Sequence, residues 1–181
     1  MNEGLIPRRY AKALYEVAVE RKSDSRLYQM MKTLEQSFSS NPKLGEVLSN
    51  PYISDSDKCG LLMTATGATD KDSLYRDFLK LLTENHRLDL SRDIAYAYVK
   101  IYRESNRIYP VKVVSAAPMT PDNEKRLKEM ITKHLKGGQM EYDHAVDPEL
   151  IGGFTVAVGN ERIDASIKNE LKQLRLNLIT K

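Results

Sequence analysis

The sequence contains a single cysteine, Cys59, and no tryptophan among its 181 residues. One cysteine excludes an internal disulfide and any site in which several cysteines hold a metal ion. With no histidine near it in the sequence, we interpret Cys59 as a small buried apolar residue. The sequence also lacks the run of about 18 apolar residues that a membrane-spanning helix needs. Residues 1–9 lack the apolar stretch of a signal peptide, so we expect the chain to stay in the cytoplasm.

No part of the sequence carries a dominant charge of one sign. The formal net charge is +3 at pH 7. Residues 1–106 contain 16 basic and 15 acidic side chains, and residues 107–181 contain 12 and 10. Proteins that bind nucleic acids concentrate basic residues on one face or in one segment, so this even distribution argues against a nucleic-acid partner.

Motifs for catalysis and cofactor binding are missing as well. There is no G-x-x-x-x-G-K followed by Ser or Thr and no G-x-G-x-x-G, so we expect no cofactor. The three histidines, His86, His134 and His144, are far apart and lack the H-E-x-x-H spacing, so we expect no metal site. The paired glycines of Asp147–Phe154 could suggest a ligand loop, but a turn with a bulge or positive-φ step leading into a strand explains them better. No residues are typical of nucleophilic catalysis, and we predict no catalytic residue.

From Pro7 to about Arg107 the sequence has a helical pattern, with breaks where Asn, Pro, Ser and Gly cluster. It predicts six helices, at Pro7–Lys22, Ser25–Ser39, Pro42–Leu48, Ser54–Ala65, Asp70–Asn85 and Asp89–Arg107. Pro7 and Pro42 suit a first helical turn, and Asp89 is the predicted N-cap of the last helix. We therefore expect residues 1–107 to form an N-terminal six-helix bundle.

The pattern changes at Tyr109-Pro110, where short β-branched segments and turn residues begin. The predicted elements are a strand at Val111–Ala116, a helix at Pro121–Lys136 ended by Gly137-Gly138, strands at Gln139–Val146 and Phe154–Val158, a hairpin turn at Gly159-Asn160 leading into Glu161–Ile163, and a final helix from Asp164 to about Ile179 with Asp164 as its N-cap. Residues 108–181 are thus expected to form a small mixed α/β domain. The whole chain is predicted to be α+β.

Two of the predicted helices carry more apolar surface than one core contact requires. The apolar residues of Pro7–Lys22 cover an arc of roughly 200°, about twice the roughly 100° of a single contact, and those of Asp70–Asn85 cover roughly 160°. Either these helices lie at the centre of the bundle, or they border a groove for a partner's amphipathic helix. Periodicity alone leaves both interpretations open. The residues that would border the groove are Tyr10, Ala11, Ala13, Leu14, Val17, Phe78, Leu81 and Leu82.

Several segments together carry a resemblance to a known family. They are Arg9–Tyr15 (RYAKALY), Leu82–Leu88 (LTENHRL), Val114–Met119 (VSAAPM, with Met in place of the commoner Leu) and Val146–Phe154 (VDPELIGGF), the last continuing to Ile163–Ser166 (IDAS). In this order and spacing they make the chain, from about residue 6 to 178, resemble the delta subunit of F-type ATP synthases, the oligomycin-sensitivity-conferring protein family.

This resemblance implies a non-catalytic peripheral-stalk (stator) subunit, which links the catalytic alpha/beta hexamer to the membrane-anchored b stalk so that rotation is coupled to ATP synthesis. It implies that the N-terminal domain binds N-terminal helices of the alpha subunits, which favours the groove interpretation. The C-terminal domain would bind the b subunit, with Gly152, Gly153, Phe154 and Asp164 as the scaffold of that contact. The location implied is peripheral, on the cytoplasmic face of the bacterial cell membrane, reached only through the complex.

Two other classes of function fit the sequence less well. A helical RNA-binding module is disfavoured by the even charge distribution and by the lack of a basic aromatic face. A small enzyme is disfavoured by the lack of a nucleophile, base or cofactor loop in the sequence.

Overall fold

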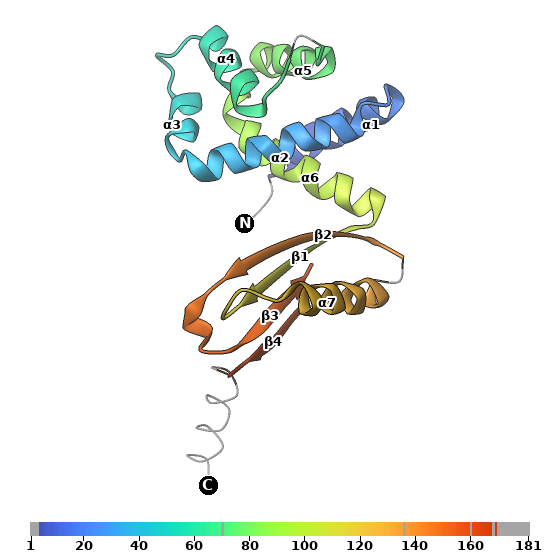
Figure 1. Cartoon of the computed structure of the whole chain (residues 1–181). Helices are drawn as coiled ribbons and strands as arrows, with labels where there is room; N and C mark the ends of the chain where they lie inside the picture. Colours follow the sequence, from blue (N-terminus) through green and yellow to red (C-terminus); the bar gives the residue numbers. More distant parts are fainter. Residues whose placement is uncertain (1–3, 70, 136, 160, 168, 170–181) are drawn as a thin grey trace. The chain divides into compact units, whose positions relative to one another are not determined.

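The structure of the protein is a computed structural model, which describes residues 4–69, 71–135, 137–159, 161–167 and 169. The chain divides into two compact units, Met1–Ser105 and Asn106–Lys181. The first unit is helical, and the second combines a four-stranded sheet with helices (Figure 1). The predicted α+β class is therefore confirmed.

The first unit contains α-helices near each predicted place, with ends shifted by up to three residues, and a short 3₁₀ helix precedes the last one. Its elements are α1 (Leu5–Glu20), α2 (Asp24–Ser40), α3 (Lys43–Ser49), α4 (Asp55–Thr66), α5 (Ser73–Glu84), the 3₁₀ helix η1 (Leu88–Leu90) and α6 (Ser91–Asn106). The N-cap predicted at Asp89 is wrong, because Asp89 lies inside η1 and α6 begins only at Ser91. The tight turn keeps Leu88 buried, and the Ser91 hydroxyl donates a 2.7 Å hydrogen bond to the Leu88 carbonyl.

Helices α2 and α6 both contribute buried side chains to the core of the first unit. Met30 and Leu34 of α2 are buried, as is Tyr98 of α6. The ring of Tyr28 in α2 stacks on that of Tyr102 in α6, with centroids 4.2 Å apart. Such ring pairs stabilise a core beyond the area they bury, so this contact helps to fix the two helices against each other.

An ion pair connects the start of α2 to the segment before α5. The Arg26 guanidinium donates two hydrogen bonds of 3.1 Å to the Asp72 carboxylate. The Thr69 backbone N–H and hydroxyl donate to the same carboxylate at 2.8 and 2.9 Å. These bonds, with that of Arg26 contributing most, lower the pKa of Asp72 to about 2 from its usual 3.8.

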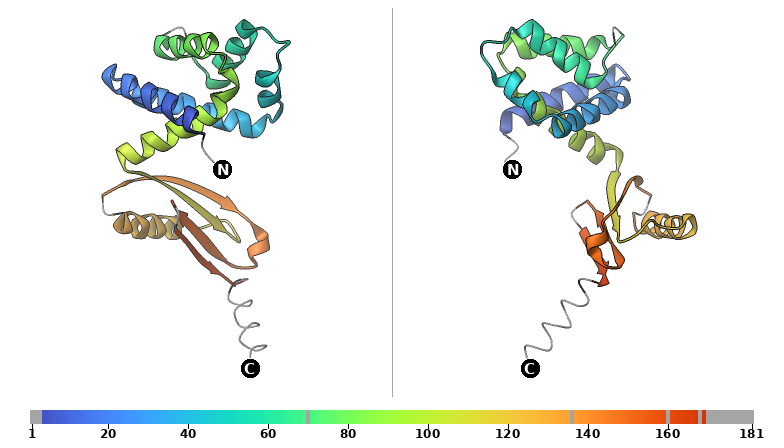
Figure 2. Two further views of the ribbon diagram at one scale, coloured as in Figure 1. Left: turned by 180° about the vertical axis from the view of Figure 1, so that it is seen from behind. Right: turned by 60° about the vertical axis from the view of Figure 1, so that its left-hand side comes forward.

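The second unit is a four-stranded sheet with a helix on one face (Figure 2). Its elements are β1 (Ile108–Ser115), α7 (Pro121–His134), β2 (Gln139–Val146), the 3₁₀ helix η2 (Pro148–Leu150), β3 (Gly153–Val158) and β4 (Glu161–Ser166). The strand order is β2-β1-β3-β4. β1 and β2 are parallel and joined through α7, whereas β1 with β3 and β3 with β4 pair antiparallel. An apolar cluster lies between α7 and the sheet. Helix α7 and the residue after it contribute Leu127, Ile131 and Leu135, and the strands contribute Val111, Val113 and Val156.

The final helix does not start at Asp164, where the sequence predicted it. Asp164 lies in β4, paired with Thr155 of β3, so the N-cap predicted at Asp164 is wrong. Its carboxylate accepts hydrogen bonds from the Ser166 backbone N–H and hydroxyl, at 3.1 and 2.6 Å. The Ser166 hydroxyl oxygen accepts a 3.2 Å bond from the Asn169 backbone N–H, as an N-cap does, and the backbone is helical at Ile167 and Asn169. The cap is therefore Ser166, and the rest of the predicted helix, to Ile179, lies outside the described residues.

Candidate functional site

Helices α1 and α5, which carry the predicted groove residues, contact each other in the first unit. The ring of Tyr10 in α1 meets that of Phe78 in α5 edge to face, with centroids 6.4 Å apart. Where the chain leaves α1, Arg21 forms an exposed ion pair of 3.8 Å with Asp77 of α5. These two contacts place one edge of α1 beside one edge of α5.

Each of the two helices presents an apolar strip along this shared edge. On α1 the strip residues are spaced by four, three and four positions, which places them on one side of a helix. On α5 the spacing is four and three. Ile6 is 40% exposed and Leu81 is 44% exposed, so the strips reach the surface. We call this surface the α1–α5 face, and it consists of Ile6, Tyr10, Ala13, Val17, Leu74, Phe78 and Leu81.

The structure divides the eight predicted groove residues into two groups. Four of them are buried in the core of the first unit, namely Ala11, Leu14, Phe78 and Leu82. The other four, namely Tyr10, Ala13, Val17 and Leu81, reach the surface, with Ala13 and Leu81 exposed. Phe78 forms the buried inner border of the α1–α5 face. Ile6 and Leu74 also belong to this face but were not among the predicted groove residues, although their spacing of four from Tyr10 and from Phe78 could have identified them.

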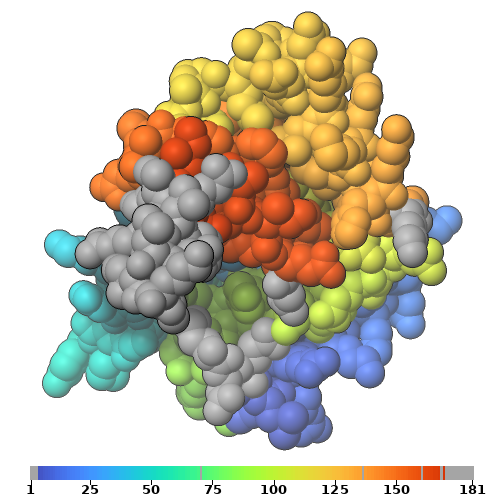
Figure 3. Space-filling model, turned by 90° about the horizontal axis from the view of Figure 1, so that it is seen from below, coloured from blue at the N-terminus to red at the C-terminus, as the bar shows by residue number. Residues whose placement is uncertain are grey.

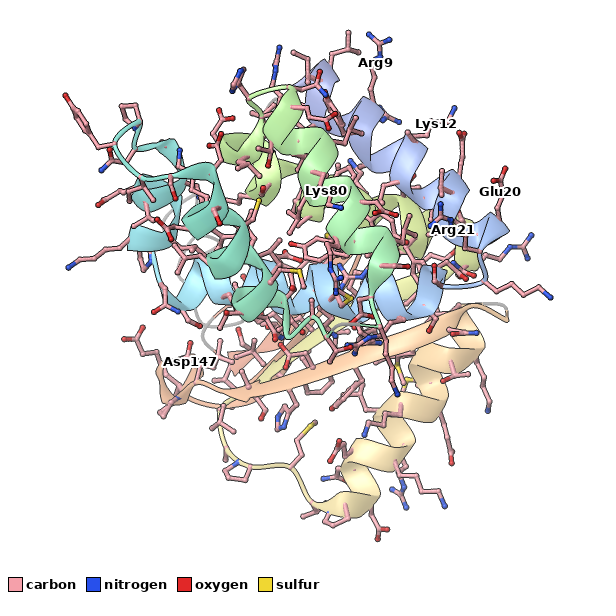
Figure 4. The ribbon with its side chains drawn as sticks, turned by 90° about the horizontal axis from the view of Figure 1, so that it is seen from above. Arg9, Lys12, Glu20, Arg21, Lys80 and Asp147 are labelled. Carbon is pink, nitrogen blue, oxygen red and sulfur yellow. The ribbon has the colours of Figure 1, made fainter. Side chains whose placement is uncertain are left out.

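Charged side chains accompany the α1–α5 face. Figure 4 shows Arg9 and Lys12 toward the start of α1, Glu20 at its end, and Lys80 on α5. Lys12 forms an exposed ion pair of 3.9 Å with Glu16. The strip on α1 spans roughly 16 Å, about three helical turns. Its chemistry therefore suits the apolar side of a partner helix of similar length.

The predicted stalk scaffold lies around the start of β3 in the second unit. Gly153 has φ +80°, and a Cβ atom there would overlap the Ala165 carbonyl oxygen, so only glycine fits. This confirms the positive-φ step predicted for the paired glycines. Phe154 is partly buried and packs against the apolar cluster between α7 and the sheet. Ala165 pairs with Phe154, so these two side chains lie on the same side of the sheet. Asp164 is the neighbour of Ala165 in β4, so its side chain lies on the other side from Phe154.

One histidine makes a contact that resembles a catalytic pair. His144 Nε2 lies 2.8 Å from Ser115 Oγ, and the Ser115 hydroxyl donates a 2.6 Å hydrogen bond to the Ala117 carbonyl. Because the hydroxyl has a single proton, it must accept the bond from the His144 ring N–H. The histidine therefore cannot act as a base toward Ser115 in this arrangement.

Metal-binding clusters and membrane-spanning helices are both absent from the described residues. Among these residues no group of three or more histidine, cysteine, aspartate or glutamate side chains is placed to hold a metal ion. No helix within the described ranges has both the length and the apolar character to cross a membrane.

Comparison with known proteins places the chain in a family. The family model described as "ATP synthase delta (OSCP) subunit" matches residues 6–178. The chain belongs to this delta (OSCP) subunit family. The match covers the α1–α5 face and the glycine pair at the start of β3.

Relatives in several bacteria match this chain over nearly the whole length of both proteins. The ATP synthase subunit delta of Parabacteroides distasonis is 38% identical over 179 residues, covering 99% of this chain and 98% of the relative. That of Bacteroides thetaiotaomicron is 35% identical, covering 100% and 97%. A chain in the cryo-EM structure of the Toxoplasma gondii mitochondrial ATP synthase hexamer has a TM-score of 0.70 at 20% identity, covering 96% of this chain and 97% of that one. At this identity the structural likeness shows a shared fold.

Proposed function

We propose that this protein is the non-catalytic adaptor that connects the catalytic alpha/beta hexamer of an F-type ATP synthase to its membrane-anchored b stalk. The chain is a delta-type (OSCP) subunit of an F-type ATP synthase and a component of the peripheral stalk. Its six-helix N-terminal bundle binds N-terminal helices of the alpha subunits, and its C-terminal domain binds the b subunit. It lies on the cytoplasmic face of the cell membrane, attached through the complex.

The observation that carries this proposal is the α1–α5 face. Ile6, Ala13 and Leu81 remain exposed on it although the remaining sides of both helices supply core residues. Fully burying a side chain of the size of leucine or isoleucine gains about 1.5–3 kcal/mol, so an amphipathic partner helix would be stabilised by covering this face. The small side chain of Ala13 in the middle of the strip allows a partner backbone to approach closely.

The mechanism that follows is mechanical and requires no bond to be broken in this chain. A stator must hold the hexamer still against the torque of the rotor, and it does so by binding tightly at two separate places. The first unit supplies one place on the α1–α5 face. The second unit supplies the other, around Gly152, Gly153 and Phe154 at the start of β3 and Asp164 of β4.

The α1–α5 face can be tested with one substitution and a matched control. Ala13→Glu should weaken binding of an alpha-subunit N-terminal peptide by at least about 100-fold, because the partner helix would bury an unpaired carboxylate. Val19→Glu is the control, since Val19 is 46% exposed and lies on the other side of α1. It should leave the affinity within about twofold. Both are measured by titration calorimetry, with circular dichroism to verify the helices. Equal peptide affinity for wild type and a folded Ala13→Glu variant would refute the proposed contact.

A further inference from the structure

Ile151 has a backbone conformation that is unfavourable for isoleucine. It lies between η2 and β3 with φ +66° and ψ −40°. These angles lie outside the left-handed helical region and near those of the classic γ-turn, which is rare and strained. The strain is greater for a β-branched side chain, whose two branches at Cβ crowd the backbone. Glycine would adopt this conformation more easily.

The fold leaves the Ile151 side chain largely in solvent. Ile151 is 67% exposed, and it is not part of the apolar cluster between α7 and the sheet. An apolar side chain stabilises a fold by being removed from water, so at this exposure Ile151 contributes little. The stability of the second unit alone therefore does not explain an isoleucine at this position.

Hydrogen bonds on both sides hold the turn that contains Ile151. Before the turn, the Asp147 N–H donates a 2.8 Å bond to the Ser115 carbonyl of β1. After it, the Gly152 carbonyl accepts a 3.0 Å bond from the Ile167 N–H. A strained residue persists only where its surroundings fix it, and such residues gather at active sites, ligand-binding sites and switch regions. Ile151 is thus held in one position at the surface.

A second exposed isoleucine lies beside this turn. Ile167 is 44% exposed, and its side chain lies so close to Gly152 that an added Cβ atom there would overlap its Cδ1 atom. Because Gly152 follows Ile151 directly, the two isoleucines belong to one small area of the surface. Figure 3 shows the orange atoms of the segment between β2 and β3 at the surface, beside the red atoms of β4. The apolar side of one partner helix is wide enough to cover both isoleucines.

The charged side chains of this turn are acidic. Residues 145–159 contain two acidic side chains, Asp147 and Glu149, and no lysine or arginine. Asp147, which Figure 4 shows at the end of β2, accepts a 3.0 Å hydrogen bond from the Glu149 N–H on its carboxylate. The Glu149 side chain is exposed and has no ion-pair partner among the described residues. The surface therefore fits an amphipathic helix whose apolar side is bordered by Lys or Arg.

We propose that Ile151 is the side chain by which the second unit anchors a helix of the b subunit, and that the turn holds it in an unfavourable conformation for this contact. The inference rests on the proposed function, in which the b subunit binds around Gly152, Gly153 and Phe154. It adds the residue that anchors the partner and the chemistry of the partner helix, an apolar position bordered by basic residues. A residue kept for binding in this way lowers the stability of the free chain.

A substitution at Ile151 separates binding from folding. Ile151→Gly removes the side chain and should weaken binding of the b-subunit stalk helices to the full chain at least about tenfold, because one buried isoleucine contact is lost. It should leave the urea midpoint equal to that of wild type or higher, because relief of the positive φ offsets the greater freedom of glycine in the unfolded chain. Ile151→Val keeps an apolar, branched side chain and should keep the affinity within about threefold.

Two further variants test the place and the charge of the contact by the same titration calorimetry. Met130→Ala is the matched control, because Met130 is 66% exposed and lies one turn before His134, which contacts Glu161 at the other end of the sheet from Ile151. It should leave the affinity within about twofold. Glu149→Lys should weaken binding at least about fivefold at low salt, and this difference should shrink as the salt concentration rises.

Each measurement can overturn the inference. Wild-type affinity in a folded Ile151→Gly variant would refute the anchor and leave the stalk contact itself intact. A lower urea midpoint for Ile151→Gly would refute it as well, since Ile151 would then serve the fold. Unchanged affinity in Glu149→Lys would overturn the basic chemistry of the partner.

Two outcomes with the wild-type chain would also decide against it. If the wild-type chain does not bind the b-subunit helices, the proposed function fails and the inference fails with it. Sedimentation of the chain without a partner examines self-association. A wild-type dimer that Ile151→Gly dissociates would assign Ile151 to a second copy of this chain.

Discussion

At the scale of single residues, Gly153 shows most clearly how the backbone restricts the sequence. Its φ of +80° costs any other residue about 1–2 kcal/mol, and a Cβ atom would collide with the backbone of β4. We expect Gly153→Ala to destabilise the second unit by about 2–4 kcal/mol and to weaken the pairing of β3 with β4. Urea unfolding followed by circular dichroism and exchange of the β3 and β4 amides measure the effect. Gly45→Ala is the control, because Gly45 lies in α3, where an added methyl group would meet no neighbouring element within 4 Å.

Asp72 provides a second prediction at this scale, one that depends on pH. Its folded pKa of about 2 is below the usual 3.8, so the carboxylate stabilises the fold at pH values above 3.8 and loses this effect as the pH falls through about 2. Asp72→Asn should therefore lower the urea midpoint at pH 7, and its difference from wild type should shrink between pH 4 and pH 2. Asp77→Asn is the control, because its pair with Arg21 is more than half exposed. A constant difference across this pH range would contradict the assignment to charge.

At the scale of elements, α4 begins at a cap that can be tested directly. The Ser54 hydroxyl oxygen accepts a 3.2 Å hydrogen bond from the Asp57 backbone N–H, and the hydroxyl lies 2.6 Å from the Asp57 carboxylate. Losing such a cap typically costs about 1 kcal/mol. Ser54→Ala should therefore destabilise the first unit by about this amount in urea unfolding. Ser56→Ala, two residues later on an exposed side of α4, should change stability by less than about 0.5 kcal/mol. A larger loss for Ser56→Ala than for Ser54→Ala would contradict the role of the cap.

The elements also show which features the sequence could predict and which it could not. Proline, glycine and cap residues indicated where most helices begin and end, because their effect is local. The sequence of α1 shows that the helix has more apolar surface than one contact requires. Which part of this surface is buried, as at Ala11, and which is exposed, as at Ala13, depends on the side that the neighbouring helices cover. Asp164 suits both an N-cap and an exposed strand position. Its pairing with Thr155 decides between them, and that pairing is a tertiary contact that local sequence does not contain.

At the scale of the whole molecule, the two units should separate in function. The fragments are best cut after Ser105, because the Arg107 carbonyl accepts a 2.9 Å hydrogen bond from the Gln139 N–H and belongs with the second unit. Residues 1–105 should fold cooperatively, bind the alpha-subunit peptide with the affinity of the full chain, and fail to bind the b subunit. Residues 106–181 have a small core and should become ordered when the b-subunit helices are added.

This division is checked by titrating each fragment with each partner. The full chain serves as the reference for both affinities, and circular dichroism monitors the folding of each fragment. Retention of full b-subunit binding by residues 1–105 would refute the proposed division and leave the second unit without an assigned partner.

The strand order β2-β1-β3-β4 has a consequence for the protein during its synthesis. β1 is made first but lies inside the sheet, so both of its edges stay unpaired until later strands emerge. About 30 further residues must follow before β2 is complete, which takes roughly 2–6 s at typical rates of translation. Unpaired apolar strands are prone to aggregate. Pro110 and Lys112 lie on either side of Val111 in β1, and such residues oppose pairing with other chains. These residues therefore oppose aggregation of β1 while it is still unpaired during synthesis. In the finished fold β1 lies between β2 and β3, so both of its edges are paired.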